Sequence, residues 1–136
     1  MAADAISLSI PHSEPFHGVA RLVVGGLAAR LDLSYEDLED LQLALVSVLE
    51  RDGYAVGPEV TVRLLVRADT VGIAIGPLDA AELSADLERP PEQGVPMRRL
   101  LETLVEEISL EQGEGGHWLR LEKHVALARG APGEEA

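Results

Sequence analysis

The clearest hydrophobic pattern lies within residues 34–52, where apolar residues recur every three or four positions. This spacing predicts an amphipathic helix with one buried stripe. Ser34 followed three residues later by Asp37 is a capping-box pattern. Leu33 and Leu38 occupy the two positions of a hydrophobic staple. The stretch therefore predicts a helix with a defined start, whose buried stripe is formed by Leu38, Leu41, Leu45, Val48 and Leu49.

The chain before this helix predicts one strand and one further helix. Ile6, Leu8 and Ile10 alternate with serines, which is the period of a half-buried strand that Pro11 ends. Residues 15–31 return to helical spacing, and Pro15 suits a first helical turn. The face that we expect this helix to bury consists of Phe16, Val19 or Ala20, Val23, Leu27 and Leu31.

The second half of the chain predicts two hairpins with a surface excursion and a helix between them. Alternating apolar residues mark the strands, and glycines mark the last turn. The excursion is rich in Pro, Asp and Glu and looks like a lid with one short helical turn. In order, these elements are a hairpin at 60–66 and 71–75, the excursion at 76–95 with its helical turn at 80–87, a helix at 96–107, and a hairpin at 108–111 and 118–125.

The order of elements predicts an α/β (α+β) fold, built as a two-layer sandwich. Two hairpins and a first strand suit a mixed, mainly antiparallel sheet, and three amphipathic helices can cover one of its faces. We expect a single domain over residues 1–128 and a flexible tail at 129–136.

Charge and composition exclude several classes of function. The formal net charge is −13, with 24 acidic and 11 scattered basic residues, which argues against binding nucleic acid. No apolar run approaches the length of a membrane span, and no basic start resembles a signal peptide. The absence of cysteine fits a reducing compartment. We therefore expect a cytoplasmic protein without a membrane partner.

Acidic residues cluster at the start of the central helix. One interpretation is a solvated face that complements the helix dipole, and the other is a contact patch for a basic partner. The cluster consists of Asp32, Glu36, Asp37, Glu39 and Asp40.

Gly25 and Gly26 interrupt the first helix, at a cost of about 1 kcal/mol each relative to alanine. Such a pair indicates either a close approach of another element or chain, or a local weakness of the helix. Under the first interpretation, Gly25 and Gly26 mark an interface.

Three strings of the sequence resemble one known family. RLVVGGLAARLDLS is followed by YEDLEDLQLALVSVLE, and LLETLVEEISLEQGEGGHWLRLEKHV lies near the end. Over residues 5–126 the chain resembles the anti-sigma-factor serine kinases of the GHKL ATPase superfamily, which also contains histidine-kinase and Hsp90-type ATPase domains. The resemblance implies a histidine-kinase-like ATPase fold.

The residues that such kinases use for chemistry are replaced here. The resemblance implies a Glu and an Asn four residues apart on the second helix. In the family the Glu positions a water or acts as a base, and the Asn binds Mg²⁺. In this chain the two positions are occupied by Ser47 and Arg51. Serine at its ordinary pKa is no general base, and arginine has only donors, so it cannot bind a cation. Arg51 could still meet a phosphate directly.

Two further nucleotide motifs of the family are also altered. The expected Asp-x-Gly-x-Gly turn reads Ile75-Gly76-Pro77-Leu78-Asp79, so that the Asp is displaced. The glycine-rich loop before the last helix retains Gly94, while Pro96 lacks an amide donor. The predicted pocket is thus a vestigial one, formed by Ser47, Arg51, Gly76, Asp79 and Gly94.

We assign no catalytic residue and no metal site. His12 and His17 lie across a strand-to-helix junction, and His117 and His124 lie seven apart on one strand. Without cysteine or a His-Glu-x-x-His motif, nothing supports zinc.

The leading hypothesis is a regulatory protein-binding module that has lost both kinase function and the ability to bind ATP. The resemblance implies a sigma factor or an anti-anti-sigma (STAS-type) protein as its partner, and homodimerisation. The first alternative is an active serine/threonine kinase with an atypical ATP and Mg²⁺ site. The second is a structural dimerisation domain.

Overall fold

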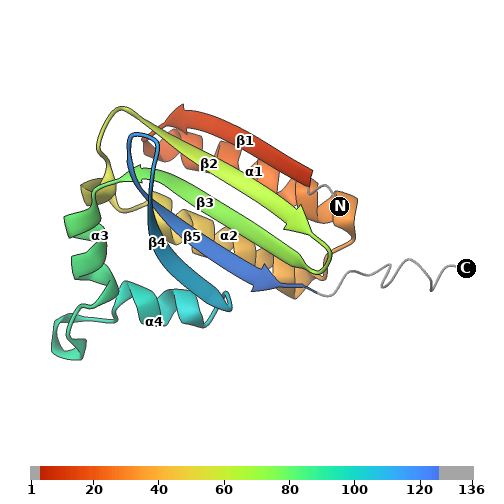
Figure 1. The fold of residues 1–136 in the computed structure, drawn as a ribbon. Helices are drawn as coiled ribbons and strands as arrows, with labels where there is room; N and C mark the ends of the chain where they lie inside the picture. The colour runs from red at the N-terminus through yellow and green to blue at the C-terminus, as the bar shows by residue number, and fades with distance from the viewer. Residues whose placement is uncertain (1–3, 126–136) are drawn as a thin grey trace, which may run out of the picture.

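The computed structural model describes residues 4–125, so the predicted tail at 129–136 lies outside the described part of the chain. Strands and helices follow one another in the predicted order (Figure 1). The elements are β1 (Asp4–Pro11), α1 (Glu14–Leu31), α2 (Tyr35–Leu49), η1 (Asp52–Tyr54), β2 (Glu59–Arg67), β3 (Thr70–Leu78), α3 (Ala80–Leu87), η2 (Pro91–Gln93), α4 (Met97–Glu102), β4 (Glu107–Gly113) and β5 (Gly116–His124).

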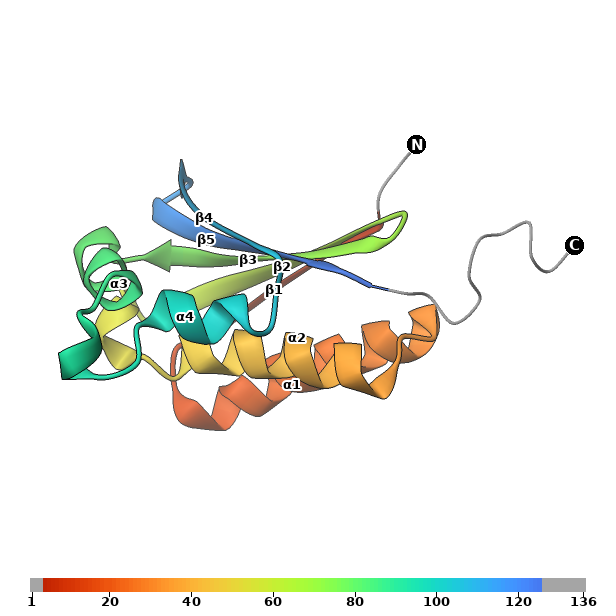
Figure 2. The same cartoon turned by 90° about the horizontal axis from the view of Figure 1, so that it is seen from below.

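The strands form one five-stranded sheet in the order β1-β2-β3-β5-β4. Each pairing is antiparallel, so the sheet is more uniform than the mixed one that we predicted. The last hairpin is placed with β5 beside β3, which leaves β1 and β4 at the two edges. Figure 2 shows α1, α2 and α4 on one face of the sheet, while no helix covers the other face.

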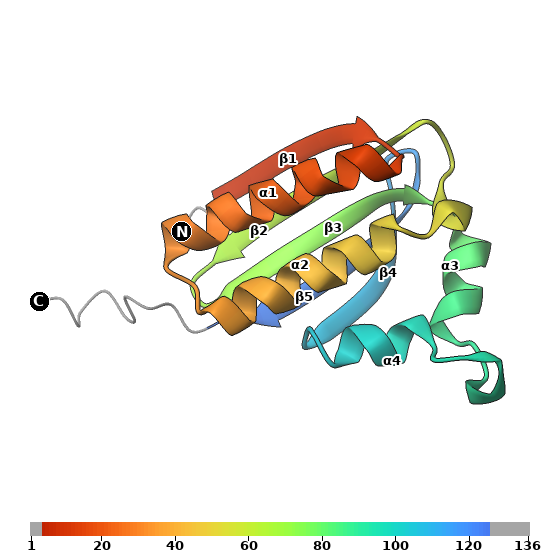
Figure 3. The ribbon, with the colours of Figure 1, turned by 180° about the vertical axis from the view of Figure 1, so that it is seen from behind.

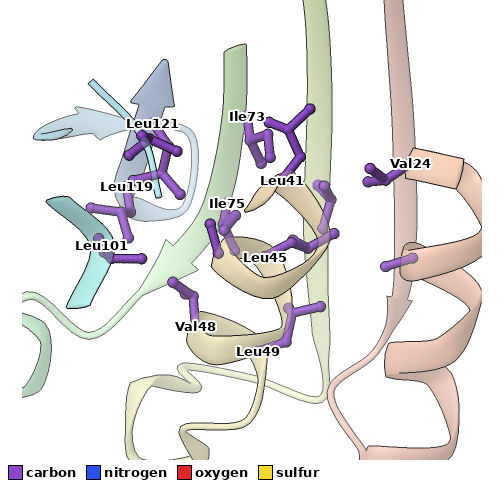
Figure 4. Close-up of a cluster of buried hydrophobic side chains, with 14 of the residues drawn as sticks. Val24, Leu41, Leu45, Val48, Leu49, Ile73, Ile75, Leu101, Leu119 and Leu121 are labelled. Carbon is purple, nitrogen blue, oxygen red and sulfur yellow. The ribbon is translucent and has the colours of Figure 1, made fainter. Parts of the chain in front are cut away.

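The core lies between α2 and the sheet. Leu41, Leu45, Val48 and Leu49 point from α2 toward the middle strands, and all four are buried (Figure 4). The predicted stripe of the central helix is therefore confirmed, and only Leu38 is partly exposed. The opposing side chains are Ile73 and Ile75 of β3 and Leu119 and Leu121 of β5.

The start of α2 also agrees with its sequence. Ser34 is the N-cap residue, and its side-chain oxygen accepts a hydrogen bond from the Asp37 N–H at 3.0 Å. The helix is shorter than expected, because it ends at Leu49 with Glu50 as its C-cap.

The buried face of α1 agrees only in part with the predicted one, since Ala20 and Leu27 are buried as expected. Phe16 and Val19 are 40% and 39% exposed, and Val23 is only partly buried. Apolar residues occur on several sides of α1, so their spacing alone does not fix which side meets the sheet. The residues that pack inward are His17, Ala20, Val24, Leu27 and Ala28.

The helix predicted at 96–107 is also shorter in the structure. α4 ends at Glu102, and the Thr103 hydroxyl donates a hydrogen bond to the Leu100 carbonyl at 2.7 Å. The chain then enters β4, where Glu107 pairs with Glu122 of β5. The last residue of the segment with helical spacing, Glu107, is therefore in strand β4 and not in a helix.

Candidate functional site

Ser47 and Arg51 do not share one continuous helix. Ser47 is partly buried near the end of α2, whereas Arg51 lies beyond the C-cap residue Glu50. The Arg51 N–H donates to the Val48 carbonyl at 3.2 Å, which is the tighter turn of a helix end. The side chain of Arg51 leaves the helix axis and turns toward α3.

The guanidinium of Arg51 is engaged within the chain. Its Nη1 atom lies 3.7 Å from Oδ2 of Asp86, which is on α3. The same Oδ2 accepts a hydrogen bond from the Tyr54 hydroxyl at 2.8 Å, and the other oxygen of Asp86 pairs with Arg89. We call Arg51, Tyr54, Asp86 and Arg89 the Asp86 cluster. Its single carboxylate accepts hydrogen bonds from Tyr54 and Arg89 and forms an ion pair with Arg51, so it joins the η1 turn, the segment after α3 and the end of α2.

Tyr54 anchors this cluster in the core. It is fully buried, and burial, followed by the hydrogen bond to Asp86, raises the pKa of its hydroxyl well above the ordinary value. Both effects keep the hydroxyl protonated, so it remains a hydrogen-bond donor to the carboxylate. The Tyr54 carbonyl also accepts from the Asp79 N–H at 2.8 Å.

Asp79 is the N-cap residue of α3. Its Oδ1 atom accepts a hydrogen bond from the Glu82 N–H at 3.0 Å, which satisfies one of the free donors at the helix start. The backbone bond to Tyr54 places Asp79 next to the Asp86 cluster. In the structure the side chain of Asp79 is used to start a helix.

Gly76 faces the sheet surface that no helix covers. A Cβ atom built on Gly76 would lie 2.3 Å from the ring of Trp118, and one on Gly113 would lie 2.6 Å from the same ring. The indole ring therefore occupies the space that side chains at these two positions would need. Gly76 therefore has a packing role beneath Trp118 in the structure.

Gly94 lies in the exposed excursion, after η2. Its φ of +117° is in the region that favours glycine, and its Cβ position lies 3.9 Å from the Arg89 side chain. Arg98 Nε on α4 donates to Glu88 at 3.0 Å. The segment between α3 and α4 is thus connected to both helices by side-chain contacts.

The Asp86 cluster has no arrangement for holding a metal ion. Mg²⁺ needs oxygen ligands, but the only carboxylate of the cluster already accepts hydrogen bonds from Tyr54 and Arg89 and is paired with Arg51. Among residues 4–125 no group of three or more potential metal ligands occurs. Arg51 and Arg89 could attract an anion only if Asp86 moved away.

The other end of α2 carries a second charged cluster, which the sequence analysis interpreted as a solvated face or a contact patch. Lys123 of β5 is only 6% exposed, and its Nζ lies 3.2 Å from Asp40 Oδ2 and 3.8 Å from Asp37 Oδ1. The same Nζ donates to the Leu104 carbonyl at 3.0 Å. Two of the five acidic residues are therefore paired with a buried lysine.

Two cavities of the described structure lie away from the predicted pocket. One, of 340 Å³, lies on the open sheet face, beside Gly72 and Trp118. The other, of 250 Å³, lies between α1 and α2, beside Arg21 and Leu43. None of the five predicted pocket residues lines either cavity.

The glycine pair of α1 separates into two different environments. A Cβ on Gly25 would lie 3.5 Å from the Gln42 side chain of α2, an ordinary contact, and one on Gly26 would meet nothing within 4 Å. Within the described chain, no element approaches either glycine closely enough to require it. The predicted interface at Gly25 and Gly26 remains a prediction.

Sequence reasoning missed Tyr54, Asp86, Arg89 and Lys123. A weak sign of one contact was present, since Asp86 and Arg89 are three apart and so lie on one side of a helical turn. The contacts to Arg51 and Tyr54 join residues more than thirty positions apart, and only the fold brings them together.

Sequence comparison finds serine-protein kinases as relatives. The chain is 28% identical over 138 residues to the serine-protein kinase RsbW of Listeria monocytogenes, across 82% of each chain. It is also 28% identical over 134 residues to RsbW of Bacillus pumilus, across 82% of this chain and 81% of that relative. A shorter match to RsbW of Halalkalibacterium halodurans is 40% identical over 42 residues, which is 31% of this chain and 26% of the relative. No family model matches the chain.

Structural comparison finds the same kind of protein. A crystal structure of the RsbU and RsbW domains of Rv1364c from Mycobacterium tuberculosis matches with a TM-score of 0.64 and 18% identity, over 90% of this chain and 32% of that one. The predicted fold class is confirmed, and the chain is related to RsbW serine-protein kinases, as its sequence indicated. No helix in residues 4–125 is long and apolar enough to cross a membrane.

Proposed function

We propose that this chain is a regulatory protein-binding module that has kept the fold of its kinase relatives and lost phosphotransfer. The observation that carries the proposal is the engagement of Arg51 by Asp86. Where the resemblance expects a metal-binding amide, the chain has a cation, and a carboxylate of α3 neutralises it. Ser47 supplies no base at the other expected position.

Loss of nucleotide binding is part of the proposal. Tyr54, Asp79 and Asp86 are engaged in contacts that hold α3 against the end of α2, so the residues near the expected site serve the fold. The Asp displaced from the family motif, Asp79, caps a helix. Gly76 supports Trp118 on the opposite face of the sheet.

The proposed partner is a sigma factor or a STAS-type anti-anti-sigma protein, in keeping with the resemblance to anti-sigma-factor kinases. A sigma-factor partner would place the module in the cytoplasm, where transcription occurs. The net charge of −13 would favour a partner with a basic contact surface. Purified sigma factors and STAS-type proteins from the same genome can be tested by calorimetric titration without nucleotide. Failure of all of them to bind would contradict the proposal.

An active kinase is the second candidate, and the names of the relatives favour it. It predicts Mg²⁺-dependent ATP binding and transfer to a seryl group of a STAS-type protein. In that case Arg51 would leave Asp86 and contact a phosphate of the nucleotide.

Thermal unfolding with and without millimolar Mg-ATP separates the two candidates. A ligand at a hundred times its dissociation constant stabilises a protein by about 2.7 kcal/mol, which shifts the midpoint by several degrees. We expect no shift, and the Listeria monocytogenes relative serves as the positive control. A shift that Arg51→Met abolishes and Arg30→Met preserves would establish an atypical nucleotide site at Arg51 and overturn the proposal.

A further inference from the structure

The cavity on the open sheet face has a low floor, formed by the middle of β3. Side chains alternate along a strand, and Ile73 and Ile75 face α2, so Gly72 and Ala74 face the side that no helix covers (Figure 2). Strands favour β-branched and aromatic residues, whereas these two positions carry almost no side chain. The cavity volume of 340 Å³ is in the range of pockets that bind small molecules.

Packing within the chain does not require Gly72. A Cβ atom on Gly72 would lie 3.7 Å from the Leu65 carbonyl oxygen, an ordinary contact, whereas one on Gly76 would collide with Trp118. A glycine inside a strand marks a bulge, a barrel corner or a close approach by a ligand or another backbone. Gly72 pairs in regular register with Leu65 and Glu122 in an open sheet, which excludes the first two. Since no helix covers this side of the sheet, Gly72 points to a ligand (Figure 3).

Two arginines flank the floor of this cavity. Ala74 pairs with Arg63 of β2 on one side and with Arg120 of β5 on the other, and residues opposite each other on neighbouring strands face the same side. Both arginines line the cavity. In a chain of net charge −13, two guanidinium groups beside one cavity favour an anion. The planar guanidinium matches a carboxylate, because it can donate two parallel hydrogen bonds.

Trp118 holds one of these arginines in place. Its ring packs on Gly76 and Gly113, and its Nε1 atom donates to the Glu114 carbonyl at 2.9 Å. The guanidinium carbon of Arg63 lies 4.4 Å from the centroid of the ring, which is a cation–π contact. Part of the site is therefore formed before a ligand arrives, which lowers the entropy lost on binding.

Carboxylates near the arginines limit the charge of the ligand. Glu114 lies 3.8 Å from Arg63, and Glu122 lies 3.3 Å from Arg120. The side chain of Glu114 is 88% exposed, so it can give way to a ligand, because exposed ion pairs contribute little to stability. Glu111 and Glu114 also line the cavity and would repel a second negative charge. These charges suit a ligand with a single acid group rather than a polyphosphate.

We propose that this cavity binds a small organic carboxylate with an apolar body. The carboxylate lies over Ala74, between Arg63 and Arg120, and the apolar body lies on Gly72 against Leu65. No residue of the Asp86 cluster lines this cavity. The inference therefore goes beyond the proposed function and holds whether or not the chain retains kinase activity.

The first test is a titration of the full chain with phenylacetate, followed by the NMR signal of the indole N–H. Trp118 is the only tryptophan of the sequence, so this one signal reports on the cavity. We expect a saturable shift with a dissociation constant of about 1 mM or lower. Phenylacetamide and phenethylamine keep the ring and lack the negative charge, and inorganic phosphate has the charge and lacks the ring. We expect each of the three to bind at least about tenfold more weakly than phenylacetate.

The second test separates the charge of the site from its space. Arg120→Met removes one guanidinium group, and we expect it to raise the dissociation constant of phenylacetate at least about tenfold. Gly72→Val keeps both arginines and fills the floor, so we expect weakening of at least the same size in a folded chain, because the new Cβ atom meets only ordinary contacts. Arg67→Met is the matched control. It removes an exposed arginine of β2 that does not line the cavity, so it should change the dissociation constant by less than about twofold. Circular dichroism checks that each variant is folded.

Four results would overturn the proposal. One is an indole signal that phenylacetate leaves unmoved at about ten times the expected dissociation constant. Another is binding of phenethylamine or inorganic phosphate as tight as that of phenylacetate. The third is equal weakening by Arg67→Met and Arg120→Met, which would indicate general attraction to positive charge. The fourth is unchanged binding by a folded Gly72→Val chain. Binding of phenylacetate that Arg120→Met and Gly72→Val weaken and Arg67→Met preserves would support the site.

Discussion

The two ends of α2 carry ionic clusters of similar composition that differ in burial. At the start of the helix, Asp37 and Asp40 pair with Lys123, whose side chain is buried under the sheet. At the end, Arg51 pairs with Asp86 while its own side chain is 39% exposed. Both arrangements agree with the helix dipole, which favours acids at the start and cations at the end. The comparison shows that Asp37 and Asp40, assigned from the sequence to a solvated face or a contact patch, and Arg51, assigned to a vestigial pocket, connect α2 to distant segments.

The largest effect is expected from Lys123→Met, which breaks the buried cluster. Methionine retains most of the volume but leaves two carboxylates without their ammonium partner and the Leu104 carbonyl without its donor. We expect a loss of about 2–3 kcal/mol in the free energy of unfolding, because removing one member of a buried ion pair is costly. Urea unfolding measures this loss.

Arg67→Met is the control for that variant. Arg67 is an exposed cation at the end of β2, and its replacement should change the free energy of unfolding by no more than about 0.5 kcal/mol. If Lys123→Met and Arg67→Met lowered the free energy of unfolding equally, the buried ion pairs of Lys123 would contribute no more to stability than an exposed cation.

A smaller effect is expected from Tyr54→Phe, which removes the buried donor of the Asp86 cluster. The lost hydrogen bond to a carboxylate should cost about 1–2 kcal/mol. The pH dependence gives a second readout. Because the pKa of Tyr54 is higher in the folded than in the unfolded chain, its contribution to stability is complete below the unfolded value of 10.0 and is lost as the pH rises above it.

Unfolding free energies between about pH 9 and 11 should therefore fall more steeply for the natural chain than for Tyr54→Phe. Tyr35→Phe is the comparison variant. The hydrogen bond to Glu39 and the charge of that residue raise the pKa of Tyr35 too, but Tyr35 is 72% exposed, so we expect its replacement to change the slope in the same direction by a smaller amount. Identical slopes for the natural chain and Tyr54→Phe would mean that the Asp86 cluster does not hold the hydroxyl protonated.

The smallest effect is expected from Arg51→Met. Its ion pair with Asp86 is 3.7 Å long and partly exposed to solvent, so its loss should cost at most about 1 kcal/mol in urea unfolding. Tyr54 and Arg89 would still hold the carboxylate. If Arg51→Met lowered the free energy of unfolding as much as Lys123→Met, the expected difference in stability between the two clusters would be contradicted.

Much of the fold could be predicted from local patterns. The strands alternate with a period of two, and the α2 stripe and its Ser34 cap follow from spacing and residue type. These features depend on neighbours within a few positions, which the sequence displays directly. The short helix expected at 80–87 appears as α3, because Asp79 caps its start.

The candidate site could be predicted only in part. Sequence reasoning found that Ser47 and Arg51 stand where chemistry was expected, and the structure shows what engages Arg51. It grouped Gly76 with the pocket, although the ring of Trp118, 42 positions later, is what requires the glycine. Contacts at such separations depend on which strands pair, and no local spacing encodes them.

The sequence by itself determined the order and type of the elements and the start of α2, since these depend on residue identity and short-range periodicity. Only the tertiary structure decided which flank of α1 is buried, where α4 ends, which residues Lys123 and Asp86 contact, and which two strands form the edges of the sheet. Each of these outcomes results from competition among distant segments for the same surface, and packing and strand pairing settle that competition once the whole chain has folded.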